Sequence, residues 1–304
     1  MGAPGNQPIQ VCEMKRTTRS GWFFISPALF YFFLFWIFPL ILAIYYSLHR
    51  WSLGQKEIYI GIKNYIDLFS DPLFFRAFKA SAQITVLAVL LTVLIALFIA
   101  VLLNDEKLVG GRFFKAFIML PVVTDWVATG LVWQLIFLPY SGVLSGFFYN
   151  LGLKELMGLR WTSSTSLASF AIIIFIVWKT TGLYTIIFLA GLKSVPKSYL
   201  EAAQIDGANS FQSFMRITMP LIRPITVFIL VSSFVSTIGL FEPVFMLTGG
   251  GPADATRVLP IFLYENFFQF QKSGYASAAG VLFLLLSLGF ALFAARLLQY
   301  SYYE

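Results

Sequence analysis

Glu201-Ala-Ala-Gln-Ile-Asp-Gly207 is a polar run that lies between two hydrophobic stretches of this 304-residue chain. Ser198 and Glu201 stand three residues apart, as in a capping box, and this spacing predicts the start of a helix. Gly207 falls where a helix of about two turns should end, because glycine adopts the left-handed C′ conformation without a Cβ penalty. We therefore predict a short helix that ends at this glycine.

A second short helix should follow the glycine, since Asn209 or Ser210 can cap its start. Pro220 and Pro224 should close this helix and lead into the next apolar stretch. Together the two helices predict a hairpin over residues 196–224 that stands outside the membrane. Apolar side chains recur every three residues along the second helix, and this spacing predicts that they share one side. They are Phe211, Phe214 and Ile217.

The composition of the chain excludes an ordinary soluble domain. Its residues are 59% hydrophobic and 12% charged, and its mean hydropathy is +0.80. Six apolar runs reach the length of about 20 residues that a helix needs to cross a bilayer. We therefore predict an all-α polytopic membrane protein with six transmembrane helices, in which Pro27 and Pro39 kink the first span or set off a short interfacial helix. The predicted spans cover residues 22–48, 82–103, 113–137, 167–192, 225–247 and 276–298.

The lysines and arginines near the ends of the spans predict the orientation of the chain. A single membrane domain, residues 22–298, lies between an N-terminal tail, 1–21, and a C-terminal tail, 299–304. The charge bias is weak overall, but the N-terminal tail and the loop at 104–112 are short and basic, and the positive-inside rule counts such segments most. We therefore predict that both tails and the 196–224 hairpin lie in the cytoplasm. The flanking charges also account for the net charge of +7, so no nucleic-acid partner is expected.

The stretch EAAQIDGANSFQSFMRITMP, residues 201–220, resembles the EAA signature of the permease subunits of bacterial binding-protein-dependent ABC importers. That signature is Glu-Ala-Ala, three residues, glycine, nine residues and then Ile-x-Leu-Pro, and its spacing is kept throughout. Met219 stands where leucine is usual, a substitution that conserves volume. Stretches at 127–137, 189–196 and 247–252 also resemble the family, and the last is typical of the first permease of maltose-type and glycerol-phosphate-type importers.

The resemblance implies a type I ABC importer permease in the bacterial cytoplasmic (inner) membrane. Such a chain forms a heterodimer with a second permease subunit, and two ATPase subunits and an extracytoplasmic solute-binding protein complete the importer. The solute would be a carbohydrate: an oligosaccharide, a sugar acid or a polyol phosphate. ATP and Mg²⁺ would be used by the ATPase subunits, so this chain would be no enzyme and would bind no cofactor. The alternative is an ATPase-independent secondary transporter or channel.

In that family the hairpin is the coupling helix that sits in a cleft of the ATPase subunit. The resemblance implies that Glu201 and Asp206 supply polar contacts to the ATPase, and that Ala202 and Ala203 allow close approach. Gly207 would permit the turn. Three apolar residues would hold the hairpin against the helix bundle or the ATPase cleft: Phe211, Phe214 and Ile217. Pro220 would close its second helix.

The remaining motifs carry no catalytic chemistry. The glycine run Thr248-Gly-Gly-Gly-Pro252 is not followed by the Gly-Lys-Ser/Thr ending that a phosphate loop needs, so it predicts a flexible outer turn. His49 is the single histidine and Cys12 the single cysteine, so neither a metal site nor an internal disulfide is expected. ATP must therefore be hydrolysed by another chain.

Three charged residues fall inside predicted spans, where an ionisable group is costly unless it is paired or hydrated. Lys179 lies near the middle of the fourth span, Asp125 within the third and Glu242 toward the outer end of the fifth. They either stabilise packing, as a Lys179–Asp125 pair or against the partner permease, or line a water-filled translocation path. A lysine in the path would attract an anionic solute or donate hydrogen bonds to neutral hydroxyl groups. The uncharged residues expected along the same path are Thr180, Thr181 and Tyr184.

Overall fold

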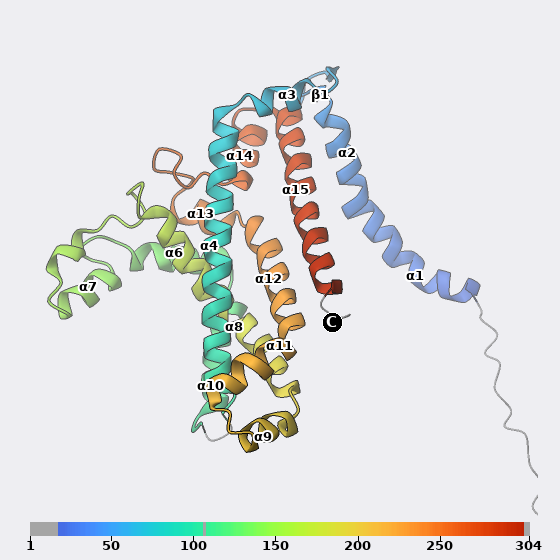
Figure 1. Cartoon of the computed structure of the whole chain (residues 1–304). Coiled ribbons are helices and arrows are strands. Elements are labelled where there is room, and N and C mark those ends of the chain that lie inside the picture. The colour runs from blue at the N-terminus through green and yellow to red at the C-terminus, as the bar shows by residue number, and fades with distance from the viewer. Residues whose placement is uncertain (1–17, 106–107, 301–304) are drawn as a thin grey trace, which may run out of the picture.

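The computed structural model describes residues 18–105 and 108–300, and over these ranges every regular element is helical apart from one short strand pair (Figure 1). Strands β1 (His49–Arg50) and β2 (Ile58–Tyr59) pair antiparallel, with His49 opposite Tyr59. Cys12 lies outside the described residues. The predicted all-α class is confirmed.

The helical elements differ widely in length, and η1, η3 and η4 are π-helical turns while η2 is a 3₁₀ turn. In chain order they are α1 (Thr18–Phe32), η1 (Phe33–Ile37), α2 (Phe38–Ser47), α3 (Lys63–Phe69), α4 (Pro72–Leu103), α5 (Gly111–Val123), α6 (Trp126–Ile136), α7 (Val143–Asn150), η2 (Lys154–Gly158), α8 (Ala168–Ser194), α9 (Lys197–Ile205), α10 (Ser210–Ser213), η3 (Phe214–Thr218), α11 (Met219–Leu221), α12 (Arg223–Ile238), α13 (Glu242–Leu247), α14 (Leu259–Tyr264), η4 (Glu265–Gln269) and α15 (Ser273–Tyr300).

Four helical segments within the described residues are long and apolar enough to cross a membrane, and two bent helix pairs bring the possible total to six. The second segment, α4, begins well before the predicted residue 82. Asp71 caps it, because its carboxylate accepts a hydrogen bond of 2.8 Å from the backbone N–H of Leu73, and Pro72 suits the first turn. The four continuous segments are Phe24–Ser47, Pro72–Leu103, Ala168–Ser194 and Ser273–Phe293.

The third and fifth predicted spans are interrupted rather than continuous. Helices α5 and α6 meet at an angle of 102°, shortly after Pro121, which cannot donate a backbone hydrogen bond. The predicted fifth helix over 225–247 is wrong as a single element. Helix α12 ends at Ile238 before Gly239, and α13 begins at Glu242 with Pro243 in its first turn. A further bend of 66° separates α10–α11 from α12.

Helices α4 and α8 form the centre of the bundle, with α12 and α15 on one side of them (Figure 1). Four alanines of α4 are completely buried, and small residues let neighbouring membrane helices approach closely. Large side chains of α8, such as Phe175 and Phe188, are completely buried and belong to two different hydrophobic clusters. The buried alanines are Ala77, Ala88, Ala96 and Ala100.

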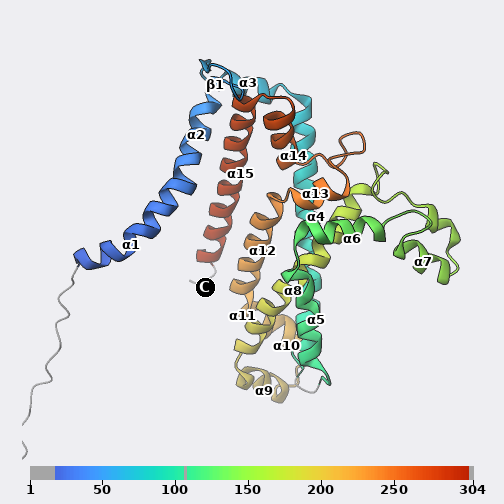
Figure 2. The ribbon, with the colours of Figure 1, turned by 180° about the vertical axis from the view of Figure 1, so that it is seen from behind.

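The two ends of the bundle differ in character. Helices α9 and α10 lie at one end, which we call the hairpin end, and β1 and α3 lie at the opposite, far end (Figures 1 and 2). Helix α2 lies beside α15, whereas α1 diverges from the bundle in both views. The first span therefore presents large apolar side chains outward, among them Trp36, which is 67% exposed.

Candidate functional sites: the coupling hairpin and the intramembrane polar groups

The first helix of the hairpin, α9, begins one residue before the predicted cap. Pro196 has an extended conformation (φ −62°, ψ 129°) and stands at the N-cap position, and no side chain caps the helix there. Ser198 is consequently inside the first turn, so the predicted capping box between Ser198 and Glu201 is wrong. Because Pro196 disfavours a helical conformation in the residue before it, α9 begins no earlier than Lys197.

The end of α9 has the geometry of a Schellman motif. Gly207 has φ +83°, and its N–H donates to the carbonyl of Gln204 at 3.1 Å. The N–H of Ala208 donates to the carbonyl of Ala203 at 2.9 Å. These two bonds satisfy carbonyls that a helix end would otherwise leave free. The predicted stop at Gly207 is confirmed.

The second helix of the hairpin begins with a complete capping box at Asn209. The side chain of Asn209 accepts a bond of 2.8 Å from the N–H of Gln212, and the Gln212 side chain accepts one of 3.0 Å from the N–H of Asn209. The predicted cap is therefore present, and both ends of the turn are fixed by hydrogen bonds. The bend into α12 falls at Ile222, between Pro220 and Pro224.

The π-helical turn η3 changes which side of the hairpin each apolar residue faces. Phe214 and Ile217 are half-buried, and Phe214 packs against the core at this end of the bundle. Phe211 is 68% exposed. The prediction that these three residues share one side is therefore only partly right, because a π turn shifts the angular spacing of the side chains.

The tip of the hairpin is apolar and exposed. Ile205 is 87% exposed and Tyr199 is 54% exposed. Both belong to α9, before the turn at Gly207, and the exposed Phe211 follows that turn. Glu201 and Asp206 are exposed on the same short segment. Exposed large apolar side chains next to charged residues are typical of a surface that binds another protein.

Lys179 lies within the membrane domain, only 2% exposed, and reaches the break between α5 and α6. Its ammonium donates to the carbonyl oxygen of Pro121 at 2.8 Å, to the hydroxyl of Thr124 at 2.9 Å and to the carbonyl of Thr124. It also lies 5.1 Å from the centre of the Trp126 ring. The lysine thus supplies the donors that these carbonyls lose where the helix is interrupted.

Asp125 stands at the same break but does not form an ion pair with Lys179 in the described residues. Its carboxylate caps α6 by accepting bonds from the N–H groups of Val127 at 2.9 Å and Ala128 at 3.0 Å. The side chain is exposed. The predicted alternative of a direct Lys179–Asp125 pair is therefore wrong, although both groups stabilise one break in the helix.

Helices α5 and α8 touch closely beside this break. A Cβ atom added to Gly182 would lie 2.0 Å from the carbonyl oxygen of Ile118. Only a glycine permits this approach, which holds the interrupted span against the continuous helix α8. Sequence reasoning missed this contact because no local pattern identifies its partner.

Thr180 and Tyr184 lie on a different side of α8 from Lys179. The hydroxyl of Thr180 lies 3.3 Å from that of Thr92 on α4, and the hydroxyl of Tyr184 lies 3.2 Å from that of Ser236 on α12. Ser236 is exposed. It was missed from the sequence, although hydroxyl residues four positions apart in an apolar helix, as at Ser232 and Ser236, are a usable signal.

Glu242 begins α13, where a carboxylate is favoured by the helix dipole, and it is half-buried. Helix α13 packs on α6, and a Cβ atom on Gly130 would lie 2.8 Å from the Cβ atom of Met246. Among the described residues no hydrogen bond or ion pair joins Glu242 to Lys179 or Asp125. Thr181 donates to the carbonyl of Val177 at 2.6 Å within α8. The six predicted path residues therefore do not form one group.

The glycine run after α13 forms a closed turn. The Thr248 hydroxyl lies 2.7 Å from that of Thr256, which donates to the carbonyl of Gly251 at 2.5 Å. Nearby, Arg257 lies 3.1 Å from Glu265. Burial raises the pKa of Glu265, and the charge of Arg257 partly opposes this. Within the described ranges no group of three His, Cys, Asp or Glu residues is placed to hold a metal ion.

Interrupted spans, intramembrane polar groups and a rigid hairpin outside the bundle define a multi-pass membrane transport protein. Residues 93–299 match the model of the family described as binding-protein-dependent transport system inner membrane component, and the chain belongs to this family. It is thus the permease subunit of an ABC transporter, which acts with an ATPase and a periplasmic binding protein and is not itself the ATPase.

Similar proteins cover nearly the whole chain. The trehalose/maltose transport system permease protein MalF of Thermococcus litoralis is 30% identical over 91% of this chain and 92% of that protein. The lactose transport system permease protein LacF of Rhizobium radiobacter is 31% identical over 88% of this chain and 90% of that protein. A bacterial ABC transporter chain involved in import of the acidic polysaccharide alginate matches the fold with a TM-score of 0.80, at 23% identity over 92% of this chain and 96% of that one. The family resemblance noted in residues 201–220 is confirmed.

Proposed function

We propose that this chain is one half of a heterodimeric permease that imports a carbohydrate across the bacterial cytoplasmic membrane. MalF belongs to a trehalose/maltose transport system and LacF to a lactose transport system, and these relatives support this class of solute. An oligosaccharide, a sugar acid or a polyol phosphate belongs to the same class. The second permease subunit would be a related chain that completes the path.

The observation that carries the proposal is the rigid hairpin with an exposed apolar tip. Hydrogen bonds at Gly207 and Asn209 fix its turn, and Phe214 anchors it to the bundle. Ile205 and Phe211 remain exposed for a partner. We place the whole hairpin, residues 196–224, and both tails in the cytoplasm. There one of two ATPase subunits would bind the tip of the hairpin.

Helix α8 would transmit the movement of the hairpin into the membrane. It runs without interruption from Ala168 to Ser194, and α9 begins three residues later at Lys197. Lys179, a residue of this helix, joins α8 to the α5–α6 break through its hydrogen bond to Pro121. When the ATPase subunits close on ATP, displacement of the hairpin would therefore move α8 and reorient α6, so that the path opens alternately to each side.

The solute would pass the hydroxyl groups of α8 and α12. Thr180, Tyr184 and the exposed Ser236 offer donors and acceptors that match sugar hydroxyls. Asp125 and Glu242 would border the path at the interrupted helices. Lys179 is buried by its own chain, and we assign it to framing the path through Pro121 and Thr124 rather than to attracting an anion.

Reconstitution of the complete transporter in vesicles tests this function. The complex should take up trehalose, maltose or lactose only when ATP and the binding protein are both present, and loaded binding protein should stimulate ATP hydrolysis. An ATPase-independent secondary transporter or channel would instead move solute through this chain alone, driven by an ion gradient. Uptake without any ATPase subunit would overturn the proposal.

A further inference from the structure

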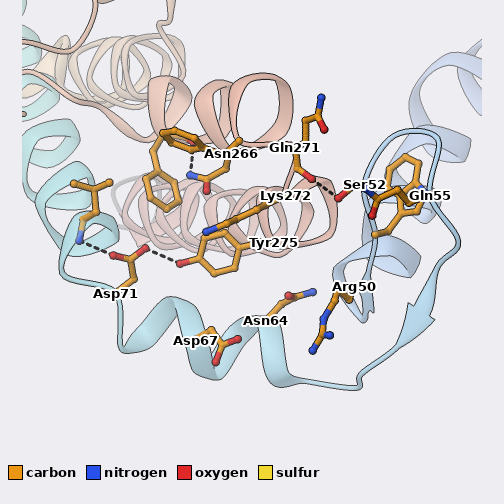
Figure 3. A pocket seen from close by; sticks show the side chains of 14 residues that line it. Arg50, Ser52, Gln55, Asn64, Asp67, Asp71, Asn266, Gln271, Lys272 and Tyr275 are labelled. Carbon is orange, nitrogen blue, oxygen red and sulfur yellow. Dashed lines mark hydrogen bonds between the residues drawn. The ribbon is translucent and has the colours of Figure 1, made fainter.

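A cavity of about 690 Å³ lies at the far end of the molecule, opposite the hairpin. Three segments form its wall: the end of β1 with the loop after it (residues 50–55), the stretch from α3 into α4 (64–73) and, distant from both in the sequence, the stretch from α14 into α15 (262–275) (Figure 3). Its volume falls within the range of about 300–1,000 Å³ that is usual for small-molecule sites. None of the path residues named above lines it.

The wall of this cavity is held in place by contacts between the three segments. The N–H of Gly274 donates to the carbonyl of Trp51 at 3.0 Å, and a Cβ atom on Gly274 would lie 2.1 Å from the carbonyl oxygen of His49. The hydroxyl of Tyr275 donates to the carboxylate of Asp71 at 2.7 Å. The cavity is therefore built into the fold before any ligand arrives, which lowers the cost of binding.

Several polar groups of the cavity have no partner within the described part of the chain. The side chains of Arg50, Asp67 and Lys272 line it without a hydrogen bond or ion pair. Asn64 and Asn266 are only 6% and 5% exposed, and each donates through its amide nitrogen, Asn64 to Ser47 and His49 and Asn266 to Phe262. The side-chain oxygens of both asparagines remain to accept bonds from a ligand.

The charges around the cavity indicate the class of ligand. Arg50 and Lys272 carry two positive charges, Asp67 and Asp71 carry two negative charges, and the sum is zero. A phosphate group or a polyamine would favour an excess of one sign. A neutral polyhydroxyl compound instead both donates and accepts hydrogen bonds. The aromatic side chains that can pack against its apolar faces are those of Trp51, Phe270 and Tyr275.

We propose that this cavity is a saccharide subsite, separate from the hydroxyl-lined path through α8 and α12. This proposal rests on the proposed carbohydrate import. It adds a second position, at the far end of the molecule, at which the permease itself holds a sugar. Lys272 and Asp67 form the pair of opposite charges that contacts the sugar hydroxyls, and the two buried asparagines orient it.

Chemical footprinting of Lys272 tests the subsite at its own position. The assembled permease–ATPase complex in lipid nanodiscs is acetylated with an amine-specific reagent, with and without trehalose or lactose, and each lysine is read by mass spectrometry. A bound sugar should slow acetylation of Lys272 and leave Lys63 unchanged, because Lys63 is exposed on α3 outside the cavity. Asp67→Asn should raise the sugar concentration needed for protection by about ten- to a hundredfold, as expected for loss of a hydrogen bond to a charged group.

Three outcomes separate the inference from the proposed function. Failure of the wild-type transporter to take up any saccharide overturns the function. Uptake of a saccharide that leaves Lys272 fully reactive overturns the subsite alone. Protection of Lys272 that needs no sugar and disappears when phosphatidylethanolamine is omitted from the nanodisc assigns the cavity to a zwitterionic lipid headgroup and also overturns it.

Discussion

The ammonium of Lys179 donates a hydrogen bond of 2.8 Å to the carbonyl oxygen of Pro121, and this contact ties the middle of α8 to the break between α5 and α6. The lysine is only 2% exposed, and the hydrogen bonds of its ammonium stay within the chain. We therefore propose that it acts on transport through the position of the interrupted helix.

Replacing Lys179 by methionine should destabilise the permease. The change removes the ammonium donor from the carbonyl of Thr124 and leaves the carbonyl of Pro121 only the Thr124 hydroxyl at 2.6 Å, and a hydrogen bond from a charged group contributes about 1.5–3 kcal/mol. We expect a fall of roughly 5–10 °C in the thermal midpoint of the purified complex. Lys193→Met, on an exposed position of the same helix, should leave the midpoint unchanged.

The same site gives a prediction about solute charge. Lys179→Gln should lower the uptake of acidic and neutral saccharides to a similar extent, because the lysine holds the helix break rather than the solute. Uptake of one saccharide of each kind, at matched expression, measures this. A loss confined to acidic saccharides would show that the ammonium binds the solute directly.

Gly182→Ala should separate α5 from α8. The new Cβ atom would lie 2.0 Å from a backbone oxygen, which cannot move aside as a flexible side chain does. Overpacking of this kind costs about 1–3 kcal/mol or more, so we expect a reduced yield of monodisperse complex by size-exclusion chromatography. Gly289→Ala is the matched control, because that glycine of α15 has open space around its Cβ position.

Much of this molecule could be predicted from its sequence, because the strongest signals were local. The length of apolar runs identified the spans, and the positions of Gly207 and Asn209 identified the turn of the hairpin. The start of α9 was misplaced because Pro196 outweighed the spacing of Ser198 and Glu201. Helix caps compete within a few residues, and the sequence alone did not decide between them.

The pairing of side chains from different helices could not be predicted. A Lys179–Asp125 pair was one of the alternatives, yet the lysine donates to backbone carbonyls that are free to accept because the third span is interrupted. The contact between Tyr184 and Ser236 depends on how α8 and α12 rotate against each other. Such rotations are set by packing over whole helices, and one sequence does not reveal them.

Tyr184→Phe and Ser236→Ala test the hydroxyl-lined path. Each removes one hydroxyl of a pair 3.2 Å apart, and a neutral hydrogen bond contributes about 0.5–1.5 kcal/mol. We expect the KM for the transported sugar to rise roughly two- to tenfold, while ATP hydrolysis without sugar stays as in the wild type. Ser287→Ala is the control, because that hydroxyl bonds only within its own helix, to Phe283. An unchanged KM in both path variants would exclude this face of α8 from the route.

Phe211 and Phe214 should respond differently to the same substitution. Phe211→Ser changes an exposed side chain at the tip, so it should weaken binding of the ATPase subunit without lowering the thermal midpoint of the permease. Phe214→Ser removes a side chain packed against the bundle and should lower that midpoint. Pull-down of the ATPase and thermal melts of the permease distinguish the two effects. Equal effects of both changes on the melt would contradict the division of the hairpin into a tip and an anchor.

Gly207 offers the most direct test of the hairpin as the point where the ATPase drives transport. It has φ +83° and open space around it, so Gly207→Leu strains the turn by about 1–2 kcal/mol without any side-chain clash. Gly152 closes the same kind of motif after α7: it has φ +77° and open space, and the N–H of Leu153 donates to the carbonyl of Phe148 at 2.9 Å. Gly152→Leu therefore imposes the same backbone strain far from the hairpin.

The decisive measurement is ATP hydrolysis stimulated by loaded binding protein, together with sugar uptake, in vesicles that contain equal amounts of each assembled variant. We predict that Gly207→Leu reduces both by about tenfold or more, as expected for strain at the coupling contact, and that Gly152→Leu leaves both near the wild-type level. Wild-type stimulation and uptake in Gly207→Leu would contradict the claim that this hairpin transmits the force of ATP hydrolysis.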